Sequence, residues 1–486
     1  MNKATGTVFK AIGTFGSIKM LSIVCSLVRN KLIAVWVGPV GLGLVILYNS
    51  ISDTLSVATR LNIDQSAVRT IAKAGEAAEA GTAAVVHRWS VLLGVAGALI
   101  MCALSPLLSL WSFGTADNWW SFCVLSVMPL SYSVSMGYQS VMQGMRRFGS
   151  LARVGLVTAL AGIAVSVPLI WWLRDGSILW VIVIYGLVML AASWALRVRL
   201  PRVRIPWRQM WQTGSEFIRL GAFITVGSVV TYLANYVFVL LLQNFTSTST
   251  LGLYQAGYTI ISSYVGVLFT GLWMEYYPRL ASMTGSAWRT SVTVSHRIVI
   301  TSLVLMPVVA VFVSVDELLV RIVYSGKFLP MVPYLTIGMA ATVLRAASWC
   351  MAHCMLARGD GHVYALTESV SAVICVALNF AGYMLWGFEG LGVAFILWYG
   401  LYLGIVWAVY RRRYGLGMRR GVMPLMWLSF AFAVAAACAK MLLGWWVPLL
   451  MGAAVSPLVL KRLLKYSLRC SLITVHIYIY MPRLSF

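Results

Sequence analysis

Charged side chains within the apolar stretches of this sequence are the residues most able to do chemistry. Hydrophobic residues make up 60% of the chain and charged residues only 10%. The bases that interrupt apolar stretches are Lys19, Arg29, Lys31 and Arg345, with Arg60 at the end of a stretch. The corresponding acids are Asp53, Glu368 and, near the end of a stretch, Glu275. A charge at bilayer depth costs about 3 kcal/mol, so we expect these side chains to face partners or water.

The excess of bases over acids at these positions suits an anionic ligand. Glu275 lies close in sequence to Arg279, and we expect the two to pair. The remaining positive charge favours a phosphate or diphosphate, which Arg and Lys bind through charge-assisted hydrogen bonds. Internal salt bridges, such as one between Arg29 and Asp53, are the competing interpretation.

Helical spacing places further polar residues beside these charges. Lys19, Ser26 and Arg29 fall within an arc of about 100° on one predicted helix. Lys31 lies about 200° from Arg29, so we expect it to extend to the outer membrane surface. The other polar residues expected to line the same cationic cavity are Ser26, Asn49, Ser52, Tyr232, Asn235, Gln255 and Tyr258. For the small residues, close packing between helices explains the pattern equally well.

The elements that carry these residues are predicted to be membrane-spanning helices. Apolar stretches of roughly 20 residues recur from near Phe9 to Leu460, and they are continuous rather than alternating. The sequence therefore predicts an all-α polytopic membrane protein of about fourteen spans. Most of the 37 Lys and Arg residues fall on one side, which predicts cytoplasmic N- and C-termini. The bases assigned to the outer loops are Arg174, Arg321, Lys327 and Lys440.

A weak internal repeat suggests that the chain arose by duplication. Leu42-Gly43-Leu44 recurs as Leu251-Gly252-Leu253, and Tyr185-Gly186-Leu187 recurs as Tyr399-Gly400-Leu401, at an offset of about 210 residues. Met142 with Arg146 and Met355 with Arg358 match at a similar offset. The predicted organisation is two six-helix bundles related by pseudo-twofold symmetry, followed by an extra helix pair and a basic, apolar tail. The boundaries are 1–205, 206–415, 416–460 and 461–486. Such repeats typically rock around a central site, which makes transport the leading class of function.

Other functional classes have little support in the sequence. The net charge of +24 follows from cytoplasmic basic clusters that set topology, so no nucleic-acid partner is expected. Cys350, His353 and Cys354 do not share one helix face and lack a fourth ligand, so no metal site is predicted. The eight cysteines indicate no disulfide framework, and neither cofactor nor cleavable signal peptide is expected.

Several stretches resemble a known family. KLIAVWVGPVGLGLVILYNSISDTLSV, STLGLYQAGYTIISSYVGVLF, YYPRLASM, LVRIVYSGKF and YRRRYG are similar to the bacterial polysaccharide transport family of lipid-linked oligosaccharide flippases. That family includes O-antigen translocases and lies within the multidrug/oligosaccharidyl-lipid/polysaccharide exporter superfamily. The resemblance covers residues 8–415 and implies two bundles around a cationic cavity.

The resemblance also implies a function. Members move undecaprenyl-diphosphate-linked glycans, such as the repeat units of O-antigen and lipopolysaccharide, between leaflets of the bacterial inner membrane, and some are coupled to H⁺ or Na⁺. It implies a role for basic residues of the first helices, which correspond to Lys19, Arg29 and Arg60. Our hypothesis is that Lys19, Arg29, Arg60 and Arg345 hold the diphosphate while Asp53, Glu275 and Glu368 serve coupling or ion pairing. It further implies a polysaccharide polymerase and a chain-length regulator as partners, beside membrane lipid.

Two alternatives remain open. A drug or cation antiporter of the same superfamily shares the helical plan, although it would favour an acidic cavity over this basic one. A membrane glycan polymerase would be an enzyme with a large catalytic outer loop, whereas the predicted outer loops here are short and contain no nucleophile with a base. The sequence therefore favours a non-enzymatic flippase that works by alternating access.

Overall fold

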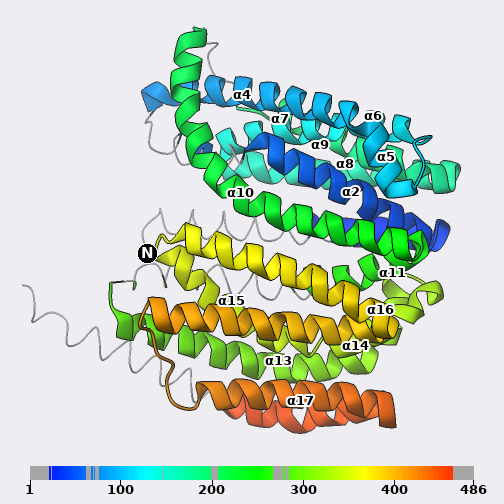
Figure 1. Ribbon diagram of the computed structural model, residues 1–486, viewed down its shortest axis with the longest axis vertical. Helices are drawn as coiled ribbons and strands as arrows, with labels where there is room; N and C mark the ends of the chain where they lie inside the picture. Colours follow the sequence, from blue (N-terminus) through cyan, green and yellow to red (C-terminus); the bar gives the residue numbers. More distant parts are fainter. Residues whose placement is uncertain are drawn as a thin grey trace, which may run out of the picture. The chain divides into compact units, whose positions relative to one another are not determined.

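The chain folds into helices, which follow one another along most of its length (Figure 1). The computed structural model describes residues 21–22, 24–61, 67–68, 71, 76–145, 147–198, 206–264, 266, 276, 280, 283 and 285–462. Within these residues every regular element is a helix. Lys19, Glu275 and all but the first two residues of the predicted tail lie outside the described residues. The principal helices are α2 (Pro39–Arg60), α4 (Glu76–Ala103), α5 (Ser105–Phe113), α6 (Trp119–Leu125), α7 (Val127–Gly144), α8 (Phe148–Leu173), α9 (Ser177–Ala195), α10 (Trp207–Phe245), α11 (Thr248–Tyr258), α13 (Ala287–Val323), α14 (Val332–Gly338), α15 (Ala341–Ala357), α16 (Gly361–Ala408) and α17 (Val422–Leu443).

The helices confirm an all-α membrane protein. In the described residues, eight helices are long and apolar enough to cross a bilayer, or nine if the bent pair of residues 326–338 and 341–357 is one span. Residues 24–36 form a further helix before α2, called the first helix below, and residues 446–462 form one after α17. The count of fourteen spans stays a prediction, because several predicted spans are broken into shorter helices.

Proline and glycine account for the breaks. The apolar stretch that follows Glu76 divides at Leu104 into α4 and α5, and α5 carries a proline in its first turn. Proline is favourable there because it lacks the N–H that an interior helical position would need. The helix α16 contains a break at Trp386 and Gly387, which separates two predicted spans. Gly387 has a φ of 58°, a conformation that glycine adopts without steric cost.

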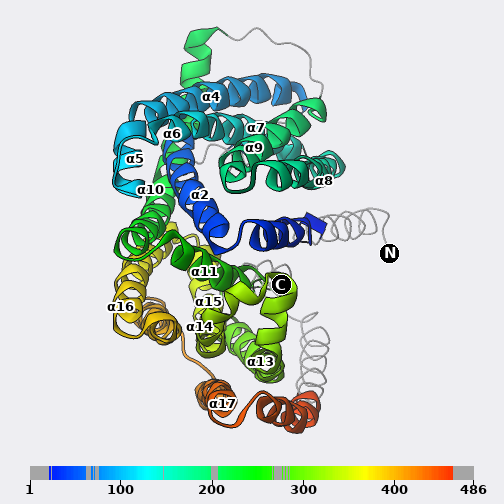
Figure 2. The same ribbon diagram turned by 90° about the vertical axis from the view of Figure 1, so that its right-hand side faces the viewer.

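The described helices form two compact units. The first unit comprises residues 1–256, 321–328 and 368–376, and the second comprises 257–320, 329–367 and 377–486. In the first unit α4 packs on α7, α7 on α9, α8 on α9, and α10 along α2 (Figures 1 and 2). In the second unit α17 packs on α14 and α15. The repeat predicts a division of the sequence at residue 205, whereas these units are groups of residues in contact. The division at residue 205 stays a prediction.

The turn before α2 contains a Gly-Pro pair. Gly38 has a φ of 88° and precedes Pro39, the first residue of α2. The left-handed conformation reverses the chain direction after the first helix, and proline then starts a new helix with a favourable φ. As a result, α2 carries Asn49, Ser52 and Asp53 back through the first unit.

Two repeat-related glycines allow α2 and α11 to cross at very close range. A Cβ on Gly43 would collide with the backbone oxygen of Thr248, and a Cβ on Gly252 would collide with the backbone oxygen of Pro39. Gly43 and Gly252 are the matched glycines of the sequence repeat, and each meets the residue four positions before the other. Each glycine thus allows the backbone at the start of the other's helix to approach closely, and the duplication itself stays a prediction.

We expect Gly43→Val to lower the stability of the protein by about 1–3 kcal/mol or more, because a backbone oxygen cannot move aside as a side chain can. The measurement is the thermal unfolding midpoint of the purified protein. Gly404→Val is the matched control, since nothing lies within 4 Å of a Cβ at Gly404. Equal midpoints for the two variants would contradict a close crossing at Gly43.

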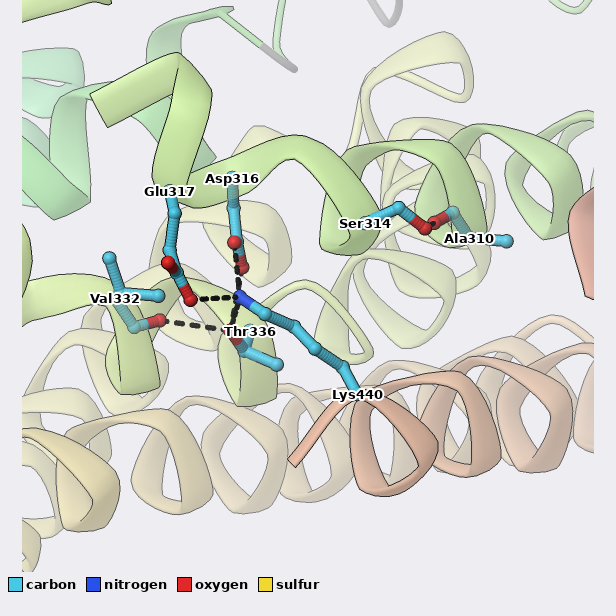
Figure 3. A network of polar contacts seen from close by, with 7 residues as sticks. All are labelled: Ala310, Ser314, Asp316, Glu317, Val332, Thr336 and Lys440. Atoms are coloured by element: carbon cyan, nitrogen blue, oxygen red, sulfur yellow. Dashed lines mark hydrogen bonds and ion pairs between the residues drawn. The ribbon is translucent and has the colours of Figure 1, made fainter. Parts of the chain in front are cut away.

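Within the second unit, a buried ion pair joins α17 to α13 (Figure 3). Lys440 on α17 bonds to Asp316 on α13, and their side chains are 9% and 0% exposed. The Thr336 hydroxyl donates to the other carboxylate oxygen of Asp316 over 2.6 Å, and Glu317 lies 3.6 Å from the lysine nitrogen. The sequence assigned Lys440 to an outer loop; the structure corrects this, because the side chain folds back onto α13 where a carboxylate compensates its charge.

Candidate functional site

Arg29 lies in a small cavity of the first unit. The cavity has a volume of about 60 Å³, enough for a few ordered waters. It is lined by Ser22, Cys25, Ser26, Arg29, Ala159, Gly162, Ile163 and Tyr185. The first helix contributes its polar face, α8 contributes small and apolar residues, and α9 contributes the tyrosine. Ser26 and Arg29, both predicted to line a cavity, therefore share one.

The guanidinium of Arg29 stacks against an aromatic ring. Its Cζ lies 4.8 Å from the centroid of the Tyr185 ring, within the range of a cation–π interaction. Gly162 makes this arrangement possible, because a Cβ at that position would lie 2.8 Å from the tyrosine ring. The face of the Tyr185 ring thus holds the cation. This contact does not use the N–H donors of the guanidinium.

Further charged and phenolic groups surround Arg29. Tyr132 on α7 lies within electrostatic range of Arg29, Asp53, Arg60 and Tyr185. The structure therefore brings the predicted residues Arg29, Asp53 and Arg60 into one region, contributed by the first helix, α2 and α7. Among the described ion pairs, none joins Arg29 to Asp53 within 4 Å, so the competing salt-bridge interpretation has no support from this geometry.

The other predicted polar residues of the first unit are dispersed over three helices. On α2, Asn49 is half-buried and Ser52 is 1% exposed, and the Ser52 hydroxyl has no hydrogen-bond partner among the described residues. On α10, Tyr232 is 39% exposed and its carbonyl accepts a bond from Thr54. Asn235 on α10 and Gln255 on α11 are half-buried. These residues belong to the same unit as Arg29, but none of them lines the small cavity.

The second unit contains a separate arginine site. Arg345 on α15 donates from Nη1 to the carbonyl of Ile261 over 3.4 Å. Its Cζ lies 5.8 Å from the centroid of the Tyr399 ring on α16. The predicted residue Tyr258 is half-buried in the same unit, whereas Glu368 is half-buried and falls in the first unit.

Lys31 and Arg29 point to different partners, as the helical spacing predicted. The Lys31 ammonium donates to the carbonyl of Tyr324 over 2.6 Å and to that of Arg321 over 3.1 Å. These carbonyls lie at the end of α13, where the unpaired C=O groups and the helix dipole attract a cation. Lys31 therefore binds a helix terminus, and its predicted extension to the membrane surface stays a prediction.

Sequence reasoning missed the aromatic members of these sites. Tyr185 and Tyr399 appeared only as matched positions of the repeat, and Tyr132 was not singled out. The signal was present for the first two, because a repeated tyrosine inside an apolar span has a polar hydroxyl that needs a reason to be there. Tyr132 had no such signal, since its neighbours come from other helices.

The cysteine–histidine group predicted not to bind metal has ordinary surroundings. His353 is buried on α15, and its Nδ1 lies 2.7 Å from the Trp349 carbonyl. No group of three or more metal-ligating side chains occurs in the described part of the chain. Guanidinium groups with hydroxyls beside them, as at the arginine sites, are suited to binding an anion.

The chain is similar to a known protein family and to solved structures. A family model described as polysaccharide biosynthesis protein matches residues 32–333. A multidrug resistance MATE family transporter of the MOP superfamily, in an inward-facing conformation, has a TM-score of 0.68 at 12% identity and covers 83% of this chain and 98% of its own. The lipid II flippase MurJ, in an inward closed conformation, has a TM-score of 0.64 at 10% identity over 93% of this chain and 98% of its own.

At these identities the structural likenesses establish the fold. An outward-facing MATE family transporter also matches, with a TM-score of 0.57 at 15% identity over 84% of this chain and 96% of its own. No curated protein sequence matches the chain. Because the family model spans more than half of the sequence, the protein belongs to the polysaccharide biosynthesis protein family, as a multi-pass membrane protein with the fold of the MATE and MurJ transporters.

Proposed function

We propose that this protein is a flippase for undecaprenyl-diphosphate-linked oligosaccharide repeat units of O-antigen or another surface polysaccharide. It moves them from the cytoplasmic to the periplasmic leaflet of the bacterial inner membrane, with both termini cytoplasmic. The observation that carries the proposal is the Arg29 cavity, a cationic site inside an apolar helical unit of a polysaccharide biosynthesis family member. Guanidinium groups bind phosphate oxygens strongly in such surroundings.

The residues take distinct roles in this proposal. Arg29, Arg60 and Arg345, together with Lys19 outside the described residues, hold the diphosphate at successive stages of translocation. The hydroxyl and amide side chains on α2, α10 and α11 bind the glycan through hydrogen bonds, and the polyprenyl chain stays in lipid. Asp53 and Glu368, with Glu275 outside the described residues, are protonatable partners that reset the bases when H⁺ or Na⁺ moves. No step makes or breaks a covalent bond, so the protein acts as a transporter and not as an enzyme.

Drug or cation antiport is the second candidate function. The structural similarity to a multidrug resistance transporter, with a TM-score of 0.68, favours antiport, because that transporter has the same fold. The charge of the cavity opposes it, since Arg29 would repel a cationic drug. A glycan polymerase has no comparable support, although a polymerase and a chain-length regulator are the expected partners in the cell.

The test is deletion of the gene in its own bacterium. We expect loss of the surface polysaccharide and accumulation of its diphosphate-linked repeat unit in the cytoplasmic leaflet, both reversed by the wild-type gene. The measurement is extraction and quantification of the lipid-linked repeat unit beside the surface glycan. Normal surface glycan together with lost resistance to a cationic drug would overturn the flippase proposal in favour of antiport.

A further inference from the structure

In each unit, an arginine lies over the tyrosine that begins the repeated Tyr-Gly-Leu tripeptide. Tyr185 in α9 and Tyr399 in α16 begin the matched Tyr-Gly-Leu tripeptides. Arg29 stacks on Tyr185 at 4.8 Å, and Arg345 stacks on Tyr399 at 5.8 Å. The arginines are not matched by the repeat, because Arg29 comes from the first helix and Arg345 from α15. The ring is therefore the common feature of the two sites, and a cation reaches it from different helices.

A ring supports a cation in a way that a carboxylate cannot. An aromatic face offsets part of the cost of placing a guanidinium in apolar surroundings. A carboxylate would do so by accepting the in-plane N–H groups, the same groups that form the paired hydrogen bonds to phosphate. With a ring as its support, Arg29 does not need a carboxylate that would occupy those donors.

Both rings are themselves held by close packing. The Tyr185 ring lies against the backbone of α8 at Gly162, where a Cβ would come within 2.8 Å of it. Tyr399 is 9% exposed, and its ring lies 5.1 Å from that of Phe395 and 4.3 Å from that of Trp398. Because the rings have little freedom to move, the guanidinium groups that stack on them are restrained as well.

We propose that Tyr185 is a positioning residue that holds Arg29 ready to bind the phosphate group of an amphiphilic lipid, and that Tyr399 positions Arg345 in the same way beside its bond to the Ile261 carbonyl. This inference rests on the proposed function for the identity of the lipid, which is a polyprenyl diphosphate. The shared chemistry is a phosphate ester at the head of an apolar chain, and an ordinary anionic phospholipid offers the same chemistry. The ring, rather than the phenolic hydroxyl, is the group that acts.

The test compares Tyr185→Leu with Tyr185→Phe in the purified full-length protein. Binding of undecaprenyl diphosphate and of phosphatidylglycerol is titrated separately in nanodiscs made from neutral lipid. We expect Tyr185→Leu to weaken binding of undecaprenyl diphosphate by about 2- to 30-fold, the range of one cation–π interaction, and Tyr185→Phe to retain it. Tyr399→Leu and Tyr399→Phe are expected to behave in the same way.

A double-mutant cycle separates positioning from a merely structural role. In the Arg29→Ala background, Tyr185→Leu should cause no further loss of binding, because the cation that it positions is gone. Tyr138→Leu and Tyr383→Leu serve as matched controls, since both tyrosines are half-buried and contact other aromatic rings instead of these arginines. Both controls should bind like the wild type.

The possible outcomes distinguish this inference from the proposed function. If binding of undecaprenyl diphosphate depends on the ring, both the positioning role and the proposed function are supported. If the wild type binds undecaprenyl diphosphate no better than phosphatidylglycerol, the proposed substrate is wrong, while ring dependence of phosphatidylglycerol binding would still support positioning. Three results would each overturn the positioning role. The first is wild-type binding by Tyr185→Leu, and the second is an equal loss of binding in Tyr185→Leu and Tyr185→Phe. The third is a further loss of binding when Tyr185→Leu is added to Arg29→Ala.

Discussion

Arg29→Ala is expected to abolish complementation of a deletion strain, with surface polysaccharide lost and the lipid-linked repeat unit accumulating. Hydrogen bonds to a charged group contribute about 1.5–3 kcal/mol each, so loss of one Arg–phosphate contact lowers substrate affinity by about 10- to 150-fold. The Tyr185 ring and the serines of the first helix cannot replace the missing charge. The measurement is surface glycan at a matched level of protein in the membrane.

Arg153→Ala is the matched control for this prediction. Arg153 lies on α8 in the same unit, but it is exposed, and its hydrogen bonds within the described part of the chain go to Gly149 and Ser150 of its own helix. Its removal takes away the same charge without touching the cavity, so we expect full complementation. Arg29→Lys should be intermediate, because an ammonium keeps the charge and loses the paired donors of the guanidinium. Full activity of Arg29→Ala at normal protein levels would remove Arg29 from the substrate site.

Lys440→Met is expected to destabilise the protein by about 3–5 kcal/mol, because it leaves the buried Asp316 carboxylate without its compensating charge. Thr336 still donates one hydrogen bond, which is too little to offset the desolvation of an ion. The methionine keeps most of the apolar volume of the lysine stem, so the effect reports the charge. Thermal unfolding of the purified protein and its level in the membrane are the measurements.

Two further variants test the origin of that loss. Asp316→Asn combined with Lys440→Met should recover much of the stability, since it neutralises the stranded carboxylate while keeping its shape. Lys327→Met should leave stability unchanged, because Lys327 is exposed and takes no part in the ion pair. If Lys440→Met unfolds at the wild-type temperature, the ion pair does not hold α17 on the second unit.

The sequence by itself determined the class of structure. A chain with so few charges can satisfy its backbone in lipid only as helices, and the length of the apolar runs sets the length of the spans. Helix α17, Val422–Leu443, lies within the extra helix pair predicted over residues 416–460, because glycines flank an apolar run of the right length. The turn at Gly38 and Pro39 was also readable, since those two residues have narrow and opposite conformational preferences.

Local periodicity also separated the two bases of the first helix. Arg29 and Lys31 are two residues apart, which puts them on different faces of any helix. The structure agrees, with Arg29 on the Tyr185 ring and Lys31 on the last carbonyls of α13. The partner of each base was not predictable, because periodicity gives the direction of a side chain but not the element that it meets.

The tertiary structure alone decided which groups are paired. Lys440 and Asp316 are more than a hundred residues apart, and nothing in the sequence indicated that α17 and α13 would bring them together. Tyr132 and Tyr185 likewise join Arg29 only through the packing of α7 and α9. Hydropathy and spacing report the cost of burying a charge, whereas compensation of that cost depends on contacts between distant helices, which only the folded chain creates.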